Sequence, residues 1–480
     1  MFSRKSTGIP GLDRILKGGY IANYSYLIRG GPGSGKTTLG IHFLTQGVSE
    51  GERCLHISLS EPVDSIKRNF EAMGFDLSRI EFLDLTPSAE LITSPSEQYT
   101  LFSPSDVERS PTTKKIIDKI KELKPSRVFI DSMTQFRYLI QDVFQFRKQV
   151  LSFFRFLKEN NITCLFTSES SADAPDEDLQ FIADGVIELE NRPEGRSIYV
   201  KKFRGSDYLK GRHSMTITER GIRVFPRLVP ERKIEEFKIE LISSGVPEID
   251  QLLGGGLEKG TTTIITGPSG VGKTTLGMQF IKEAAGRGEN SAVYLFDEDK
   301  ETLLTRCDSV NIPAHIMEKK GTLLVRYIES LKYGADEFSD IIRRDVRGRN
   351  IKIVMIDSLS GYKVGIKEGD ISIHLHALCR YLKNLGITVI LINEVASVIG
   401  DFKITEIGAS YLADNIIFLR YLEVEGELRK AIGVLKKRLG DFEKTLREFS
   451  ITKYGIKVGE PLRGLRGILQ GIPQIQKKEQ

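Results

Sequence analysis

The chain contains one phosphate-binding pattern twice, nearly half its length apart. The pattern G-x-x-x-x-G-K-T begins at Gly30 and again at Gly267. Glycines at these positions let backbone N–H groups converge on phosphate oxygens at a helix N-terminus, which favours anions. The lysine of such a loop reaches the β- and γ-phosphates, and the next threonine offers a hydroxyl to Mg²⁺. The predicted nucleotide-binding residues are Gly30, Gly31, Pro32, Gly33, Ser34, Gly35, Lys36, Thr37 and Thr38 in the first half, and Gly267, Pro268, Ser269, Gly270, Val271, Gly272, Lys273, Thr274 and Thr275 in the second.

Two aspartates could complete a metal site beside these loops. Asp131 and Asp357 each end a continuous apolar run, and each is followed by a serine. A carboxylate at the end of a buried strand beside a P-loop helps to hold Mg²⁺. The alternative is an aspartate that starts an ordinary strand-to-helix loop. The predicted metal ligands are therefore Thr37 and Asp131 in the first half, and Thr274 and Asp357 in the second.

Hydrolysis also needs a group that polarises the attacking water, and acidic residues follow a further predicted strand in each half. Glu61 stands there in the first half, while the second half has Asp297 and Glu298. A carboxylate close to the γ-phosphate can act as a general base. We predict these three acids as catalytic residues. The alternative is that these acids belong to a solvated turn with no catalytic role. The sequence favours this alternative more strongly in the first half, because only one acid stands there.

A K-x-R pattern occurs late in each half of the chain. It consists of Lys202 and Arg204 in the first half, and of Lys436 and Arg438 in the second. Two cations aimed at the γ-phosphate of a neighbouring subunit would stabilise the charge of the transition state. We predict this role in trans for all four residues. The alternative is a solvated basic strand end.

The elements that position these residues form two similar domains. Predicted strands at residues 26–29 and 263–266 feed the two loops, and continuous apolar runs end at the two aspartates. Strands of this kind, alternating with helices, predict an α/β fold with a mostly parallel sheet flanked by helices in each domain. The predicted boundaries are residues 1–232 and 233–460 for the domains and 461–480 for a flexible tail. Residues 86–113 are predicted to form a flexible surface loop.

Composition narrows the possible functions of the chain. Its 480 residues include 69 basic and 64 acidic ones, and the net charge of +5 is too small to indicate a nucleic-acid ligand by itself. No apolar run is long enough for a membrane span, and nothing resembles a signal peptide. The four cysteines are far apart and form no ligand pairs, so we expect reduced, buried thiols and a cytoplasmic location.

Taken together, these residues resemble the KaiC family, double-domain ATPases of the RecA type known from the cyanobacterial clock. The resemblance rests on the segments 7–19 and 244–256, both P-loops, both Asp-Ser strand ends, Asn393-Glu394-Val395, and the stretch 421–449. It implies two tandem RecA-like P-loop NTPase domains that bind ATP and Mg²⁺. It also implies a homohexamer of two stacked rings with ATP between subunits, in which the K-x-R residues act in trans.

The resemblance further implies an ATPase in the first domain, and an ATPase with autokinase activity in the second. Where the family has paired glutamates, this chain has Ser60-Glu61 and Asp297-Glu298. Serine cannot act as the base, so hydrolysis in the first domain would be weak or would depend on Glu61. The family's phosphorylated Ser-Thr pair falls on Ser410-Tyr411, with Thr405 nearby. We predict phosphorylation at Ser410, with Thr405 as a further candidate, and a regulatory protein partner at the tail.

Three hypotheses follow, and the sequence leaves all of them open. The leading one is a KaiC-like ATPase and serine/threonine autokinase in signalling or circadian-type timing. The second is a RecA-type ATPase that depends on nucleic acid, against which the chain offers no zinc finger, helix-turn-helix or basic stripe with aromatics. The third is a hexameric scaffold that ATP holds together without turnover.

Overall fold

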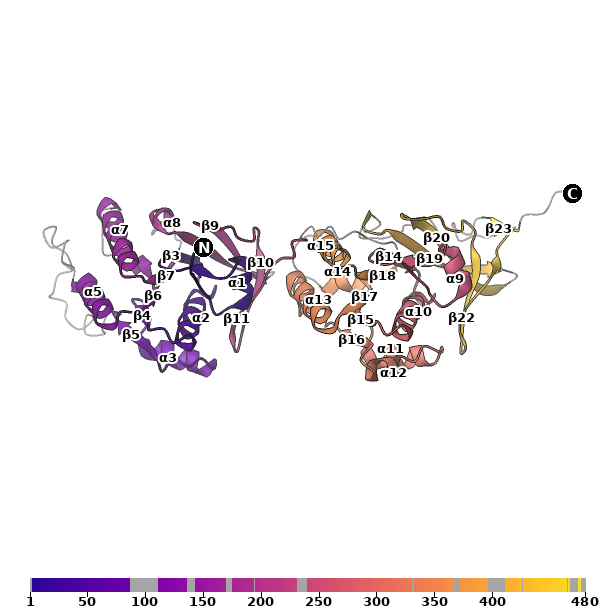
Figure 1. The fold of residues 1–480 in the computed structure, drawn as a ribbon, viewed down its shortest axis with the longest axis horizontal. Helices are drawn as coiled ribbons and strands as arrows, with labels where there is room; N and C mark the ends of the chain where they lie inside the picture. The colour runs from indigo at the N-terminus through magenta and orange to yellow at the C-terminus, as the bar shows by residue number, and fades with distance from the viewer. Residues whose placement is uncertain are drawn as a thin grey trace. The chain divides into compact units, whose positions relative to one another are not determined.

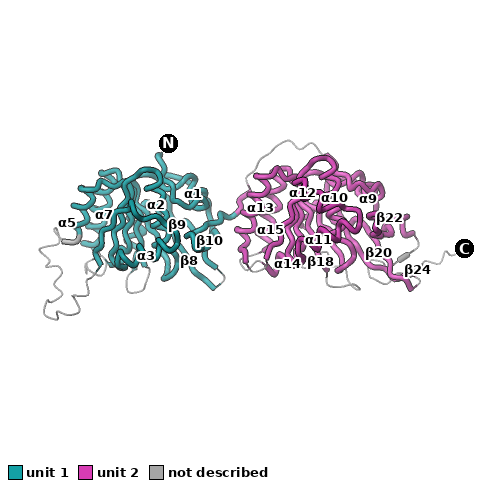
Figure 2. Tube along the Cα trace, turned by 90° about the horizontal axis from the view of Figure 1, so that it is seen from below, with its two compact units in different colours: residues 1–227 teal, residues 228–480 magenta. Residues whose placement is uncertain are grey.

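The computed structural model divides the chain into two compact units, Met1–Arg227 and Leu228–Gln480 (Figure 2). It describes residues 2–86, 111–135, 143–169, 175–193, 195–230, 240–329, 332–365, 371–395, 411–424, 426–463, 465–466 and 474–475. The predicted domain boundary at 232/233, nearly all of the predicted loop 86–113 and most of the predicted tail lie outside these residues. Each unit is described by itself.

The first unit is built on a nine-stranded sheet in the order β5-β4-β6-β7-β3-β8-β9-β10-β11. The strands from β5 to β8 run parallel, and the last three are antiparallel. The strands are β3 (Ser25–Gly30), β4 (Cys54–Ser58), β5 (Ile80–Asp84), β6 (Arg127–Asp131), β7 (Thr163–Ser168), β8 (Gly185–Arg192), β9 (Gly195–Phe203), β10 (His213–Thr218) and β11 (Gly221–Phe225).

Helices cover both faces of this sheet, with one apolar core on each side (Figure 1). On one face Ile28 and Phe129 pack with α1 (Pro10–Ile15), α2 (Lys36–Ser49) and α3 (Val63–Ala72). On the other, Leu27 and Val128 pack with α5 (Pro111–Leu123), α7 (Val143–Glu159) and α8 (Glu177–Ile182). Adjacent residues of one strand therefore point to opposite cores, which explains the continuous apolar runs in the sequence.

The second unit repeats this arrangement with the strand order β16-β15-β17-β18-β14-β19-β20-β21-β22. The strands are β14 (Thr262–Gly267), β15 (Asn290–Leu295), β16 (Leu323–Tyr327), β17 (Ile351–Asp357), β18 (Thr388–Glu394), β19 (Asn415–Val424), β20 (Glu427–Lys437), β21 (Arg447–Thr452) and β22 (Gly455–Pro461). The helices of one face are α9 (Pro247–Leu252), α10 (Lys273–Gly286), α11 (Lys300–Asp308) and α12 (Ala314–Lys319); those of the other are α13 (Ala335–Arg349), α14 (Leu359–Gly365) and α15 (Ile371–Asn384). The predicted fold class, two mostly parallel α/β domains, is confirmed.

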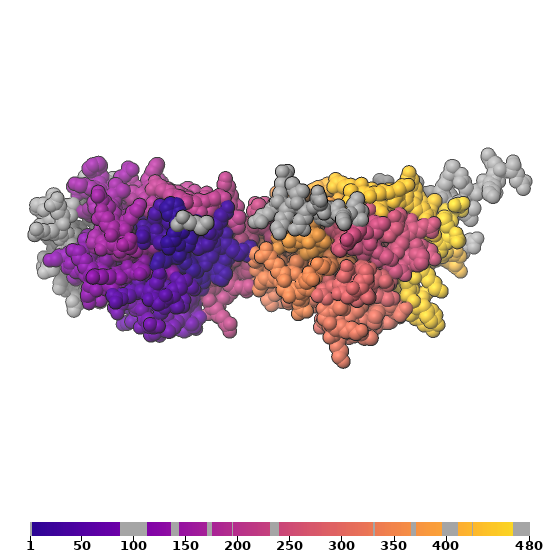
Figure 3. Space-filling model, in the orientation of Figure 1, coloured from indigo at the N-terminus to yellow at the C-terminus, as the bar shows by residue number. Residues whose placement is uncertain are grey.

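Short two-stranded sheets accompany the large ones. They are β1 (Arg4–Lys5) with β2 (Tyr20–Ile21), β12 (Leu241–Ile242) with β13 (Leu257–Glu258), and β23 (Leu465–Arg466) with β24 (Gln474–Ile475). In the space-filling view, salmon and orange segments that include α11, α12 and α13 form much of the visible surface of the second unit (Figure 3).

Among the described residues, no helix is both long and apolar enough to span a bilayer. All four cysteines are described, and each is buried and unpaired.

The helix after each P-loop lies close against the strand that ends in the predicted metal-binding aspartate. A side chain at Gly40 would meet the ring of Phe129, whose Cζ lies 2.2 Å from the ideal Cβ position. At Gly277 the sulfur of Met355 lies 2.5 Å from the ideal Cβ position. Only glycine allows this approach, which sets α2 on β6 and α10 on β17.

Candidate nucleotide sites

Each P-loop connects the central strand of its sheet to a long helix. In the first unit it joins β3 to α2, and in the second it joins β14 to α10. The residues before the helices, Gly35 and Gly272, have φ angles of 101° and 115°, a left-handed region that favours glycine. Free N–H groups at the start of each helix therefore face the loop, as an anion site requires.

The P-loop lysines are mostly buried and lie over their own loops. The ammonium of Lys36 donates to the carbonyls of Gly30 at 2.7 Å and Gly31 at 3.1 Å, and that of Lys273 donates to Pro268 at 2.7 Å. Burial lowers the pKa of both lysines, while nearby carboxylates oppose that change. The nearby carboxylates neutralise these buried cations only in part, and a bound phosphate would supply the remaining negative charge.

The threonine after each lysine contacts the predicted metal-binding aspartate. Thr37 Oγ1 donates to Asp131 Oδ2 at 2.6 Å, and Thr274 Oγ1 donates to Asp357 Oδ2 at 2.7 Å. Burial raises the pKa of Asp357, and the bond from Thr274 is the largest opposing effect. In both units the peptide bond after the aspartate is cis.

These oxygen atoms fit Mg²⁺, which prefers hard oxygen ligands and is usually held by one or two protein groups together with water and phosphates. Within the described segments, no group of three or more histidine, cysteine or acidic residues is placed to hold a metal ion. A metal at Thr37 and Asp131, or at Thr274 and Asp357, would therefore depend on the nucleotide's phosphates for its remaining ligands.

The acidic residues of the second unit lie at the same end of the sheet as its P-loop. Asp297 follows β15 and accepts a hydrogen bond from Ser358 Oγ at 2.5 Å. Glu298 accepts one from Arg306 at 2.8 Å. Burial raises the pKa of Glu298, Arg306 opposes this, and the charge of Asp357 adds to it. Two carboxylates therefore stand beside the predicted metal ligand Asp357.

The corresponding place in the first unit carries less charge. Ser60 follows β4, and its hydroxyl donates to the backbone carbonyl of Asp131 at 3.4 Å. Glu61 receives a long hydrogen bond of 3.4 Å from Asn69, the residue that stands where the second unit has Arg306. The structure thus places Glu61, Asp297 and Glu298 near the P-loop end of their sheets, in two different settings.

The K-x-R cations lie at the other end of the central strand from the P-loop of their own unit. Lys202 donates to the carbonyls of Gln180 and Phe181, and Arg204 pairs with Asp184 at 3.6 Å. The amide of Asp184 binds the carbonyl of Ser25, the first residue of β3, whereas the P-loop begins at its last residue.

The second unit repeats this placement. Lys436 donates to the carbonyl of Ala413, and Arg438 pairs with Asp414 at 3.3 Å. The amide of Asp414 binds the carbonyl of Thr262, the first residue of β14. A six-residue strand is roughly 16 Å long between its end residues, too far for these cations to reach their own P-loop.

Three site features escaped the sequence analysis. Tyr421 donates to the carbonyl of Ser269 at 3.3 Å, and Lys430 donates to that of Gly270 at 3.1 Å, so β19 and β20 hold the second P-loop from the side. The charges of Glu169 and Glu394 oppose the lowering of the pKa of Lys36 and Lys273 more strongly than the charges of Asp131 and Asp357 do. The recurrence of a glutamate at the ends of two equivalent strands was a signal that could have revealed Glu169 and Glu394.

The predicted phosphosites Ser410 and Thr405 lie outside the described residues. Their neighbour Tyr411 is described: its side chain is 56% exposed, and its ring stacks on His376 at a centroid distance of 5.9 Å.

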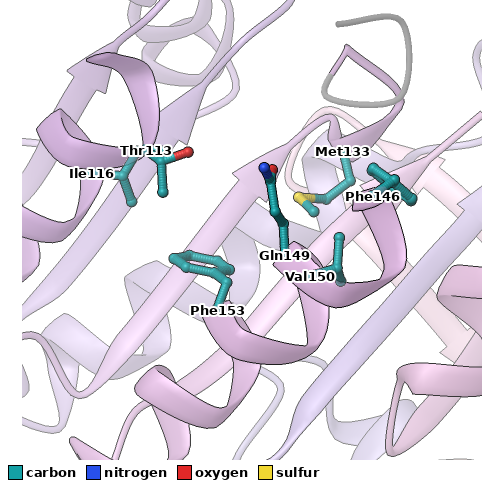
Figure 4. Close-up of a pocket in the computed structure, with 7 residues that line it drawn as sticks. All are labelled: Thr113, Ile116, Met133, Phe146, Gln149, Val150 and Phe153. Atoms are coloured by element: carbon teal, nitrogen blue, oxygen red, sulfur yellow. The ribbon is translucent and has the colours of Figure 1, made fainter. Parts of the chain in front are cut away.

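A small cavity of about 40 Å³ lies between α5 and α7, and none of its lining residues belongs to a P-loop (Figure 4). It is lined by Thr113, Ile116, Met133, Phe146, Gln149, Val150 and Phe153. Its lining is mostly apolar and it is too small for a nucleotide, so we assign no ligand to it.

Comparison with known proteins decides the family. A protein-family model described as "ATPase: KaiC" matches residues 5–229 and again residues 242–463. The chain belongs to the KaiC ATPase family. Both matches contain a complete P-loop and the aspartate paired with its threonine, so membership of the family covers both candidate nucleotide sites.

Curated relatives agree over almost the whole chain. A circadian clock protein KaiC3 from Synechocystis sp. is 29% identical over 97% of this chain and 94% of its own length. Circadian clock oscillator proteins KaiC from Picosynechococcus sp. and Synechococcus elongatus are 30% and 28% identical, over 97% and 98% of this chain and 92% of their own lengths. The resemblance inferred from the sequence is thereby confirmed.

Proposed function

We propose that this KaiC-family ATPase binds ATP with Mg²⁺ at both P-loops, hydrolyses it, and phosphorylates its own second unit at Ser410, with Thr405 as a further acceptor. The observation that carries the proposal is the contact between the P-loop threonine and the strand-end aspartate, at 2.6 and 2.7 Å, beside a buried lysine in both units. The fold alone does not require a threonine–aspartate contact beside a buried lysine in both units, whereas binding of a nucleotide with its metal ion does.

The residues of the second unit have separate tasks in this reaction. The loop amides and Lys273 bind and orient the phosphates, and Thr274 with Asp357 would hold the metal ion, which would neutralise phosphate charge. Ser358 orients Asp297, which accepts the proton of the attacking water or of the acceptor hydroxyl. The new bond forms at the γ-phosphorus as its bond to the bridging oxygen breaks, and ADP leaves.

We further propose that the protein works as a homohexamer of two stacked rings in signalling or circadian-type timing, with a regulatory partner at residues 461–480. The placement of the K-x-R cations supports an assembly, because Lys202, Arg204, Lys436 and Arg438 lie too far from the P-loops of their own units. The neighbouring subunit's P-loop is their proposed target.

The test is ATP hydrolysis and incorporation of label from γ-³²P-ATP by the full chain and by Lys36→Ala and Lys273→Ala. We expect hydrolysis with label on the second unit, and loss of the label in Lys273→Ala but not in Lys36→Ala. Hydrolysis without label would contradict the kinase role. Hydrolysis that requires DNA or RNA would favour the nucleic-acid-dependent alternative, and ATP-dependent hexamers without turnover would favour the scaffold.

A further inference from the structure

A further carboxylate stands beside each P-loop lysine, at the end of the strand next to the one that leads into the loop. Glu394 is the last residue of β18 and pairs in register with Gly267, the first residue of the second P-loop. Glu169 follows β7, whose last residue pairs with Arg29, one residue before the first P-loop. Equivalent topology therefore brings one glutamate to each nucleotide site.

The backbone of Glu169 is fixed while its side chain is exposed. Its amide donates to Thr134 Oγ1 at 2.9 Å, and Thr134 is a buried residue of the segment that follows Asp131. Burial lowers the pKa of Lys36, and the charge of Glu169 opposes this more strongly than that of Asp131. The carboxylate therefore acts on Lys36 from a position that is open to water.

The first unit lacks the base that the second unit has. Ser60 has no acidic group, whereas its counterpart Asp297 is held by Ser358. Glu61 is turned toward Asn69 of α3. Among the described acids of this site, Asp131 is bound to Thr37, which leaves Glu169 as the carboxylate next to the lysine.

We propose that Glu169 is the general base of the first unit, in place of Glu61. Its carboxylate accepts a proton from the attacking water while the water oxygen bonds to the γ-phosphorus. The bond between that phosphorus and the bridging oxygen breaks, so that ADP takes the electron pair and phosphate is released. In the second unit Asp297 performs this step and Glu394 does not. The inference rests on the proposed ATP hydrolysis in the first unit.

The test measures hydrolysis and ATP affinity in the full chain carrying Lys273→Ala, which confines turnover to the first unit. Adding Glu169→Gln should lower kcat by roughly 100-fold or more, the usual contribution of a general base, with ATP affinity unchanged or tighter. Adding Glu61→Gln should change kcat by less than about threefold if, as proposed, its proton transfer is not used. Introducing Ser60→Asp with Glu169→Gln should restore part of the lost rate.

The matched control is Glu394→Gln in a chain carrying Lys36→Ala, where Asp297 remains and kcat should fall less than about tenfold. A parent protein that binds ATP but has no hydrolysis would contradict the proposed function of the first unit. A parent that hydrolyses ATP and retains its kcat with Glu169→Gln would overturn only the present inference. Equal losses from Glu169→Gln and Glu394→Gln would also overturn it.

Discussion

At the scale of single residues, the threonine of each P-loop and the strand-end aspartate act as a pair. Asp131→Asn and Asp357→Asn keep the shape of the side chain and remove its charge. Each should weaken Mg²⁺-dependent ATP binding or turnover of its own unit by roughly 10- to 100-fold, as expected for groups that support a metal. Titration of ATP binding against Mg²⁺ checks this. Equal binding by wild type and variant at all Mg²⁺ concentrations would contradict the assignment.

A second prediction concerns the hydroxyl that orients Asp297. Ser358→Ala removes the donor that lies 2.5 Å from this carboxylate. A hydrogen bond to a charged group contributes about 1.5–3 kcal/mol, so kcat of the second unit should fall by about tenfold or more with little change in ATP affinity.

The position-matched control for Ser358→Ala is Ser132→Ala. Ser132 follows Asp131 in the first unit, where Ser60 replaces the acid. This control should leave hydrolysis by the first unit nearly unchanged. A loss of ATP affinity in Ser358→Ala, in step with the loss of kcat, would indicate a structural role for the hydroxyl.

At the scale of elements, a buried histidine links the helix of the first P-loop to the edge of its sheet. His42 on α2 accepts a hydrogen bond from the amide of Ile222 in β11 at 2.8 Å. Burial lowers the pKa of His42 to about 4. Because the unfolded chain binds this proton near pH 6.5, the native state loses stability as the pH falls from about 6.5 to about 4, by up to about 3 kcal/mol.

Hydrogen exchange of the β11 amides between pH 7 and pH 4 tests this dependence, once the intrinsic pH effect on exchange is removed. Protection should decline through that window and should decline less in His42→Asn. His56 also has a pKa lowered to about 4 by burial and lies between Phe82 and Phe129, so it contributes in the same direction. A wild-type protein whose protection is independent of pH would contradict the prediction.

The fourth prediction concerns a buried arginine at the start of β6. Arg127 is fully buried, binds Glu50 and Glu52, donates to the carbonyls of Ser6 and Phe43, and lies 4.8 Å from the ring centre of Phe43. Arg127→Ala leaves these acceptors without their cation and should cost about 3–5 kcal/mol of the free energy of unfolding. Urea denaturation measures it.

The control for Arg127→Ala is Arg53→Ala. Arg53 lies one residue before β4 and makes an exposed bond to the carbonyl of Leu123. Its removal should change stability by no more than about 0.5 kcal/mol. If the two substitutions lowered the free energy of unfolding equally, the contacts of Arg127 would contribute no more to stability than those of the exposed Arg53.

The sequence predicted the elements near the P-loops well because two signals coincided there. Glycine spacing marked the turns, and continuous apolar runs marked strands that are buried on both faces, such as the one ending at Asp357. The antiparallel strands β9, β10, β21 and β22 left no such run, since buried residues are mixed with exposed and partly exposed ones along them. The setting of Glu61 could not be predicted, because its contact with Asn69 depends on how α3 packs.

At the scale of the whole molecule, the K-x-R cations lead to a prediction about assembly. Arg438 pairs with Asp414, whose amide binds the carbonyl of the first residue of β14. Lys273 lies at the opposite end of this strand, where it begins the helix that follows the P-loop. One chain therefore cannot supply both groups to one second-unit site. If subunits complete each other's sites, an Arg438→Ala subunit offers an intact P-loop and a Lys273→Ala subunit offers an intact cation.

Each of these variants alone should have little hydrolysis by the second unit, which is measured in chains that also carry Lys36→Ala. Co-expression with two different tags, followed by purification through both, yields mixed assemblies. If mixing in a cyclic assembly is random, about a quarter of the interfaces combine the intact P-loop with the intact cation, and activity should return to about that fraction of the Lys36→Ala parent. Cations that acted within their own chain would give no recovery, because every subunit would then carry one defective group.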